Sequence, residues 1–255
     1  MSGSLKVFDL SGKVALTTGG SRGLGRAIVN GLAISGAQVA FCYKSDSSSA
    51  EAVVNEVESK TGHRPLAIQA DVVANEARQR LIGQINKEFG PIDILVNNAG
   101  TREDGIALRM TEAWDDVLEL DLTAPFRLSQ LVLRSMSRRL WGRIINIGSI
   151  ASRIGLAGQA NYNAAKAGLE GLSRSLSQEY GKKGITVNTI NPGFIETDLT
   201  EDASAELRQA LLSRVAIPKE LSPEAVANAV VFLASGEAWA ITGQALNVDC
   251  GAVKS

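Results

Sequence analysis

The chain has 255 residues, with 26 Lys and Arg against 27 Asp and Glu. This length predicts one α/β domain or two small ones, and the net charge of −1 argues against a general nucleic-acid-binding protein. Two cysteines are too few for a disulfide framework, and no Cys/His/Asp cluster has the spacing of metal ligands. Without a signal peptide or a membrane-length apolar run, we expect a cytoplasmic protein with no membrane partner.

Short apolar runs alternate with helical segments along the chain. Strands are predicted over residues 13–18, 38–43, 65–70, 93–97, 143–148, 185–190 and 245–249. Helices are predicted over 26–35, 47–60, 75–89, 112–139, 161–182 and 224–234, with Pro125 kinking or restarting the fourth. The strands are continuously apolar and no linker interrupts them, which predicts a single α/β domain over 1–255, a parallel sheet with helices on both faces.

A glycine-rich loop follows the first predicted strand. It reads T-G-x-x-x-G-x-G from Thr18, at a point where the backbone of a dinucleotide-binding protein approaches a pyrophosphate and a helix begins. A simple tight turn is the alternative, but the position after the first strand favours cofactor binding. The candidate cofactor-binding residues of the loop are Gly19, Ser21, Arg22, Gly23, Leu24 and Gly25.

The end of the second predicted strand distinguishes the two nicotinamide cofactors. A carboxylate there would bind the ribose 2′-hydroxyl and repel a 2′-phosphate. This chain has Tyr43 and Lys44 instead, with Arg22 able to reach the same pocket and no acid nearby, which favours NADP(H). Asp46 would be the exception if the strand ended later.

A serine, a tyrosine and a lysine form a candidate catalytic set. Tyr162 and Lys166 are one helical turn apart, so a nearby ammonium can stabilise the phenolate. Ser149 ends an apolar run and can hold a carbonyl oxygen facing the tyrosine.

These segments together resemble the short-chain dehydrogenase/reductase family from about Leu10 onward, and most closely its 3-oxoacyl-[acyl-carrier-protein] reductase subgroup. The resemblance rests on the glycine loop, on Asp71-Val72, on Asn97-Asn-Ala-Gly100, on Ser149 with Tyr162-Asn-Ala-Ala-Lys166, and on Asn191-Pro-Gly193. It implies a Rossmann-type, doubly wound sheet of about seven strands in the order 3-2-1-4-5-6-7. It also implies a homotetramer in which helices 112–139 and 161–182 pack across subunits.

The resemblance also implies roles for single residues. Tyr162 would donate the proton, Ser149 would hold the oxygen, and Lys166 would make the tyrosine more acidic and bind the nicotinamide ribose. The further residues implied to contact the cofactor are Asp71, Val72, Asn98, Ala99, Gly100, Pro192, Gly193, Ile195 and Thr197. Residues of about 196–222 would cover the substrate, and Arg134 and Arg174 would dock an acidic carrier protein.

Three positions depart from the family pattern. Asp121 stands where the family has an asparagine that holds a water near the active-site lysine, and we expect a working relay with a shifted pH profile. The 216–223 loop lacks the glycines and the arginine usual in the subgroup, which leaves acyl selectivity open. Cys250 stands where the subgroup tends to have glycine.

Three functional hypotheses follow. The first is NADPH-dependent reduction of a 3-oxoacyl thioester, on acyl carrier protein, in fatty-acid or polyketide-type synthesis. The second is reduction or oxidation of a free ketone, sugar or secondary alcohol, which the altered 216–223 loop would favour. The third is a weakly active cofactor-binding subunit that pairs with an active homologue, for which Asp121 is the only support.

Overall fold

A seven-stranded parallel sheet forms the centre of the molecule. The computed structural model describes residues 7–195 and 215–253, and its strand order is β3-β2-β1-β4-β5-β6-β7, as the family resemblance implied. The strands are β1 (Val14–Thr18), β2 (Gln38–Tyr43), β3 (Leu66–Gln69), β4 (Ile94–Asn97), β5 (Gly142–Ile147), β6 (Ile185–Pro192) and β7 (Ala245–Val248).

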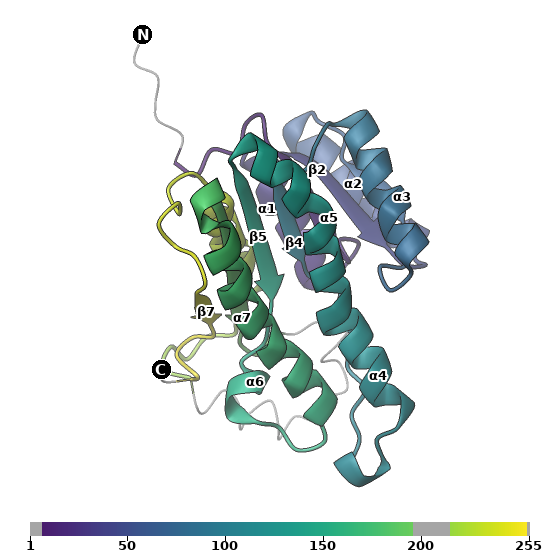
Figure 1. Cartoon of the computed structure of the whole chain (residues 1–255), viewed down its shortest axis with the longest axis vertical. Helices are drawn as coiled ribbons and strands as arrows, with labels where there is room; N and C mark the ends of the chain where they lie inside the picture. Colours follow the sequence, from purple (N-terminus) through teal and green to yellow (C-terminus); the bar gives the residue numbers. More distant parts are fainter. Residues whose placement is uncertain (1–6, 196–214, 254–255) are drawn as a thin grey trace.

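Helices cover both faces of this sheet. One face packs against α1 (Gly23–Ile34), α2 (Ser47–Thr61) and α9 (Pro223–Ala234), and the other against α3 (Asn75–Glu88), α5 (Ala124–Arg139) and α7 (Ala160–Tyr180). Figure 1 shows α5 and α7 against the near face, with α4 (Glu112–Leu118) and α6 (Ala151–Ile154) at the end to which β5 points.

Two apolar cores result, one on each face of the sheet. Neighbouring residues of a strand point to opposite faces. Ala15 of β1 therefore joins the core under α1, while Val14 and Leu16 join the core under α3 and α5. Both faces are buried, which explains the continuously apolar strands. None of the helices within 7–195 and 215–253 is long and apolar enough to cross a membrane.

The predicted 112–139 helix is interrupted by a π-helical turn, Glu119–Thr123, between α4 and α5. Pro125 has no amide to give to the carbonyl four residues earlier, that of Asp121, so regular α-helical bonding stops there. The predicted interruption at Pro125 is confirmed, but it extends over the turn before the proline. π turns of this kind often occur at functional sites, and this one contains the fully buried Asp121.

Several local expectations differ from the structure. The short helix α6 was not predicted, and β6 runs two residues further, to Pro192. Leu169 and Leu176 lie on the 161–182 helix that was implied to pack across subunits, and both are buried in the chain's own structure. Cys250 has φ 55°, a left-handed conformation that favours glycine, which gives a physical reason for the glycine that the resemblance implied at that position.

Glycines 25 and 83 offer a matched test of this packing. A Cβ on Gly25 would lie 2.0 Å from the Gly19 carbonyl oxygen, whereas a Cβ on Gly83 of α3 meets nothing within 4 Å. We expect Gly25→Ala to lower the free energy of unfolding by about 3 kcal/mol, because α1 must move off β1. Gly83→Ala should raise it by about 0.5–1 kcal/mol through helix propensity. Equal effects in denaturant titrations would contradict the packing described for α1.

Candidate active site

The glycine loop is held against the end of β4 by hydrogen bonds. The Thr18 hydroxyl oxygen accepts from the amides of Asn98 (3.0 Å) and Ala99 (2.9 Å). The Asn98 side-chain amide donates to the carbonyls of Thr18 (2.9 Å) and Gly19 (3.1 Å). Gly19 has φ 64°, and a Cβ there would lie 3.1 Å from the Ala99 Cα. These contacts fix two predicted cofactor segments, the loop and residues 98–100, side by side.

The amino terminus of α1 opens directly from this loop. Arg22 precedes the helix in an extended conformation, and within the described residues no side chain caps α1 and no acidic residue occupies its first turn. The first amides of a helix carry partial positive charge and bind phosphate groups. Gly23 begins the helix with φ 49°. The loop therefore has the shape and the donors that a pyrophosphate needs.

At the ends of β2 and β3 a lysine and an aspartate form an ion pair. Lys44 Nζ lies 2.9 Å from Asp71 Oδ2, so the expectation that no acid lies near Lys44 is wrong. Burial raises the pKa of Asp71, but the hydrogen bond and attraction of Lys44 and the Val73 amide outweigh it and lower the pKa. Asp46 caps α2, where hydrogen bonds from Ser49 and Ser48 lower its pKa to about 2.

Arg78 is a buried residue that the sequence analysis did not single out. Its guanidinium Nη1 donates to the carbonyls of Val72 (2.7 Å) and Val73 (2.6 Å). It thereby fixes the turn after β3 in which Asp71 and Val72 lie. Nothing in the sequence indicated this contact, because Arg78 reaches the Val72 carbonyl only through the direction in which α3 begins.

Lys166 is buried at the carboxyl end of β5. Its ammonium donates to the Ile147 carbonyl (3.1 Å) and lies 3.0 Å from Asp121 Oδ2. The Tyr162 ring centroid is 5.4 Å from the same nitrogen. Burial lowers the pKa of Lys166, but attraction to Asp121 and to Tyr162 is stronger, so the pKa lies above its ordinary value.

Asp121 is the buried counter-charge. Its side chain has no exposed surface, its Oδ1 accepts from the Thr101 amide (2.9 Å), and its Oδ2 makes the ion pair. A Cβ on Gly100 would lie 3.0 Å from Asp121 Oδ2 and 3.2 Å from Lys166 Nζ, so glycine lets this backbone approach the pair. In this chain an ion pair occupies the place where the resemblance implied an asparagine and a water.

Ser149 and Tyr162 lie on segments that begin at the same edge of the sheet. The Ser149 hydroxyl oxygen accepts from the Ala151 amide (3.1 Å), and half-buried Tyr162 is in the first turn of α7. Asn161, a second residue the sequence analysis missed, anchors that turn. Its side-chain amide donates to the carbonyls of Glu103 (3.1 Å) and Ala113 (2.9 Å).

The end of β6 supplies the remaining described residues of the predicted set. The Ile150 amide donates to the Pro192 carbonyl (3.1 Å), which joins this end to the segment after Ser149. A Cβ on Gly193 would lie 2.8 Å from the Asp249 Cα, and Ile195 is buried. Thr197 and most of the 196–222 segment lie outside the described residues.

Arg134 and Arg174, the predicted docking residues, are both exposed. Arg174 is about 12 Å along α7 from Lys166, at 1.5 Å per residue, and its Nη1 lies 3.7 Å from Glu170 Oε2. Carrier docking at these arginines stays a prediction. No group of three or more His, Cys, Asp or Glu side chains in the described part of the chain could hold a metal ion.

Comparison with known proteins identifies the family. Residues 19–253 match the profile of a family described as enoyl-(acyl carrier protein) reductase. The chain belongs to the short-chain dehydrogenase/reductase family. It is 44% identical over 245 residues to the 3-oxoacyl-[acyl-carrier-protein] reductases of Vibrio cholerae and Escherichia coli, covering 96% of this chain and 98% of each relative. A dehydrogenase/reductase structure from Sinorhizobium meliloti superimposes with a TM-score of 0.90 at 36% identity, covering 97% of both chains.

Family membership makes the chain a nicotinamide-dependent oxidoreductase. The described residues fit such a cofactor. The loop glycines leave space that side chains would fill, and α1 presents uncapped amides on the same side as the Lys166 ammonium. The geometry thus combines a phosphate site at β1 with a buried lysine beside a tyrosine at β5.

The Asp121 carboxylate should set the pH range of activity. Asp121→Asn keeps the shape but leaves the Lys166 ammonium without a counter-charge, so it attracts a phenolate more strongly. We expect the fall in reduction rate at high pH to begin about one pH unit lower than in the wild type. The pair contributes its stability fully below the ordinary lysine pKa and loses it as the pH rises through the raised pKa of Lys166.

The measurement is kcat against pH for wild type, Asp121→Asn and Asp116→Asn. Asp116 is an exposed acid on α4, so its substitution makes the same change in charge without touching the pair. Superimposable profiles for all three proteins would contradict the assigned role of Asp121. A large gain in rate for Asp121→Asn would instead favour the weakly active subunit.

Proposed function

We propose that the protein reduces a 3-oxoacyl thioester, carried by acyl carrier protein, to the 3-hydroxyacyl thioester with NADPH, in fatty-acid or polyketide-type synthesis. The observation that carries this proposal is the 44% identity, over 96% of the chain, to two enzymes that bear the name of that reductase. The buried lysine beside Tyr162 supports it, because carbonyl reduction needs a proton donor next to a cation.

In this reaction the bound cofactor supplies a hydride to the carbonyl carbon. The Tyr162 hydroxyl gives its proton to the carbonyl oxygen, and the Ser149 hydroxyl donates a hydrogen bond that holds the same oxygen. The Lys166 ammonium, 3.0 Å from Asp121 Oδ2, would bind the nicotinamide ribose and favours the tyrosinate that remains after proton transfer.

The choice of NADP(H) over NAD(H) rests on the ends of β1 and β2. Arg22 and Lys44 supply positive charge there. Asp46, the acid that could have bound a 2′-hydroxyl, is committed to capping α2. Asp71 is paired with Lys44, so its negative charge is compensated next to the expected 2′-phosphate.

An apolar cavity beside α6 supports an acyl substrate. Its lining includes Ile150, Ile154, Phe194 and Leu221, which are apolar side chains suited to an acyl chain. Lys219 and Leu221 belong to the 216–223 loop that departs from the subgroup pattern. Ile150, the neighbour of Ser149 in sequence, lines this cavity, so the acyl chain of a substrate whose carbonyl is held by Ser149 could extend into it.

Carrier docking and assembly are further parts of the proposal. Exposed Arg134 and Arg174 would attract an acidic carrier, which steers its approach. A homotetramer follows from the family resemblance and is compatible with the exposed Trp239 and the half-exposed Leu246 of edge strand β7. Sedimentation of the purified protein measures the assembly directly.

The proposed reaction is tested with a substrate panel. Purified protein should oxidise NADPH faster than NADH with a 3-oxoacyl thioester, and the KM should be lower when the thioester is on carrier protein than on coenzyme A. Tyr162→Phe removes the proton donor and should lower kcat by about 10²–10⁴-fold. Absorbance at the nicotinamide band follows each reaction.

The panel also contains a free ketone, a sugar and a 2-enoyl thioester. Activity with the ketone or sugar alone would replace the proposal by the second hypothesis. Activity with the enoyl thioester alone would replace it by double-bond reduction, as the family description suggests. Unchanged kcat in Tyr162→Phe would exclude the assigned proton donor.

The Lys44–Asp71 pair predicts cofactor selectivity. Lys44→Ala removes one cation and leaves the Asp71 carboxylate uncompensated next to the 2′-phosphate. We expect the KM for NADPH to rise about 10-fold, the loss of one charge-assisted contact, while the KM for NADH changes little. Lys87→Ala, an exposed lysine of α3, is the control for general loss of charge. Equal changes for both cofactors would exclude contact of Lys44 with the phosphate.

A further inference from the structure

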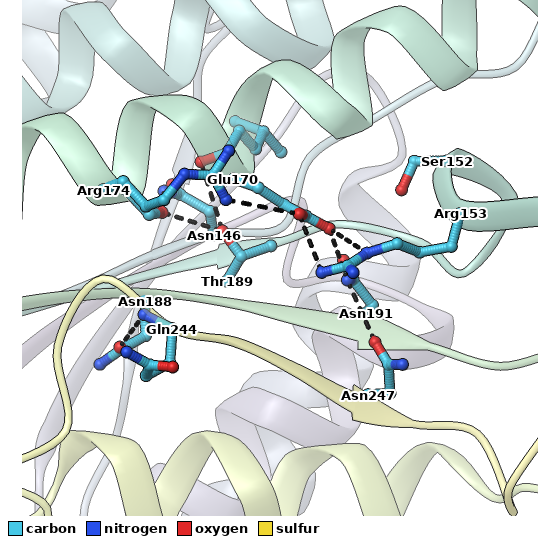
Figure 2. Close-up of polar contacts among 12 residues, drawn as sticks. Asn146, Ser152, Arg153, Glu170, Arg174, Asn188, Thr189, Asn191, Gln244 and Asn247 are labelled. Atoms are coloured by element: carbon cyan, nitrogen blue, oxygen red, sulfur yellow. Dashed lines mark hydrogen bonds and ion pairs between the residues drawn. The ribbon is translucent and has the colours of Figure 1, made fainter. Parts of the chain in front are cut away.

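Glu170 is a buried carboxylate one turn beyond Lys166 on the same face of α7, and the reaction described above gives it no role. Its side chain is 9% exposed, and a carboxylate at that depth needs partners. Arg153 supplies a bidentate pair, Nε to Oε1 at 2.8 Å and Nη2 to Oε2 at 2.9 Å. The Asn191 side-chain amide donates to Oε1 at 2.8 Å, and Figure 2 shows all three side chains converging between α6, α7 and β6.

Arg153 ties Glu170 to the segment that begins with Ser149. Arg153 is in α6, and residues at the start of this short helix hydrogen-bond both the hydroxyl and the carbonyl oxygen of Ser149. The Ser149 hydroxyl oxygen accepts from the Ala151 amide (3.1 Å), and the Ser149 carbonyl accepts from the Ser152 hydroxyl (2.7 Å). A four-residue helix is not stable by itself, so its orientation depends on contacts with the rest of the chain, and the bidentate pair joins it to α7.

Asn191 ties Glu170 to the other side of the site. It is the residue of β6 before Pro192 and Gly193, which the resemblance implies to contact the cofactor. Its side-chain amide also reaches Asn247 Oδ1 of β7 at 3.3 Å. The Ile150 amide also donates to the Pro192 carbonyl. The segment after β5, helix α7 and the end of β6 are therefore each joined to the other two, through Arg153, Asn191 and this backbone hydrogen bond.

We infer that Glu170 is a positioning residue, which through Arg153 and Asn191 holds Ser149, the Tyr162–Lys166 helix and the Pro192–Gly193 segment at fixed separations. This inference rests on the proposed function of those residues. Arg174 adds little to the arrangement, because it is 3.7 Å from Glu170 and 62% exposed, where ion pairs contribute weakly.

A second ion pair in the chain allows positioning to be separated from stability. Asp93 and Arg139 have nearly the same exposure, 9% and 32%, as Glu170 and Arg153, 9% and 37%. Asp93 precedes β4, so it lies at the opposite, amino-terminal edge of the sheet. Its hydrogen-bond partners among the described residues, Val14, Arg139 and Arg143, do not belong to the site. Both pairs should contribute similarly to the free energy of unfolding, but only the Glu170–Arg153 pair contacts the segments of the site.

The experiment compares Glu170→Gln with Asp93→Asn. Each substitution keeps the side-chain shape and removes the charge that its arginine needs. We expect similar decreases in melting temperature, but a loss in kcat of about 10-fold in Glu170→Gln only, because small displacements of reacting groups are costly. If Glu170→Gln keeps kcat within about twofold of wild type, the pair is structural and the inference is overturned. An equal loss of kcat in Asp93→Asn overturns it as well.

Amide hydrogen exchange of the protein without substrate gives a readout that does not depend on the reaction. Glu170→Gln should speed exchange of the amides in 150–155 and 193–195, and Asp93→Asn should not. The double variant Arg153→Gln/Glu170→Gln should lose less kcat than the product of the fold losses of the two single variants. If the wild type reduces no 3-oxoacyl thioester, the proposed function fails, while the exchange result still decides whether Glu170 orders these segments.

Discussion

The structure depends on burying one ammonium at the carboxyl end of β5. Taking Lys166 out of water costs several kcal/mol by effective estimates, and the cost is offset by a single carboxylate, Asp121, that is buried as deeply. The π turn before α5 brings Asp121 inward, and Gly100 lets the backbone after β4 close over the pair. A change to the π turn or to Gly100 would disturb the pairing of the two charges. The ion pair therefore connects the π turn between α4 and α5 to the position of Lys166.

The same pair has a consequence for the chemistry. An ammonium facing an asparagine presents a full positive charge to its surroundings, whereas one that contacts a carboxylate at 3.0 Å presents mostly a dipole. The hydrogen bond of Lys166 to the Ile147 carbonyl and its place beside Tyr162 do not involve the Asp121 side chain. What Asp121 changes is the strength of the field at the phenol, not the arrangement of the groups.

Local sequence signals predicted the parts of the fold that local physics determines. The strands followed from apolar runs, and the loop at Gly19 from glycines between a strand and a helix. The contacts that adjust the site were not predictable in this way. Lys44 meets Asp71 across two strands, and Arg153 meets Glu170 across two helices, so neither spacing carries a signal before the fold is known. Helix α6 is too short to show a hydrophobic period.

A line of hydrogen-bonded polar side chains through the core fixes the position of α7 along the sheet, and with it the positions of Lys166 and Glu170. Asn97 donates to Asn146 (2.8 Å), Asn146 to Ser173 (3.0 Å), and Ser173 shares a hydrogen bond with Thr189 (2.8 Å), which joins β4, β5, α7 and β6. Apolar packing alone would tolerate a helix that slides or rotates, but a buried hydroxyl that loses its partner costs about 1–3 kcal/mol. Ser173 is two turns beyond Lys166 on the same face, so the hydrogen bonds that fix it also fix the height of the lysine and of Glu170 between them.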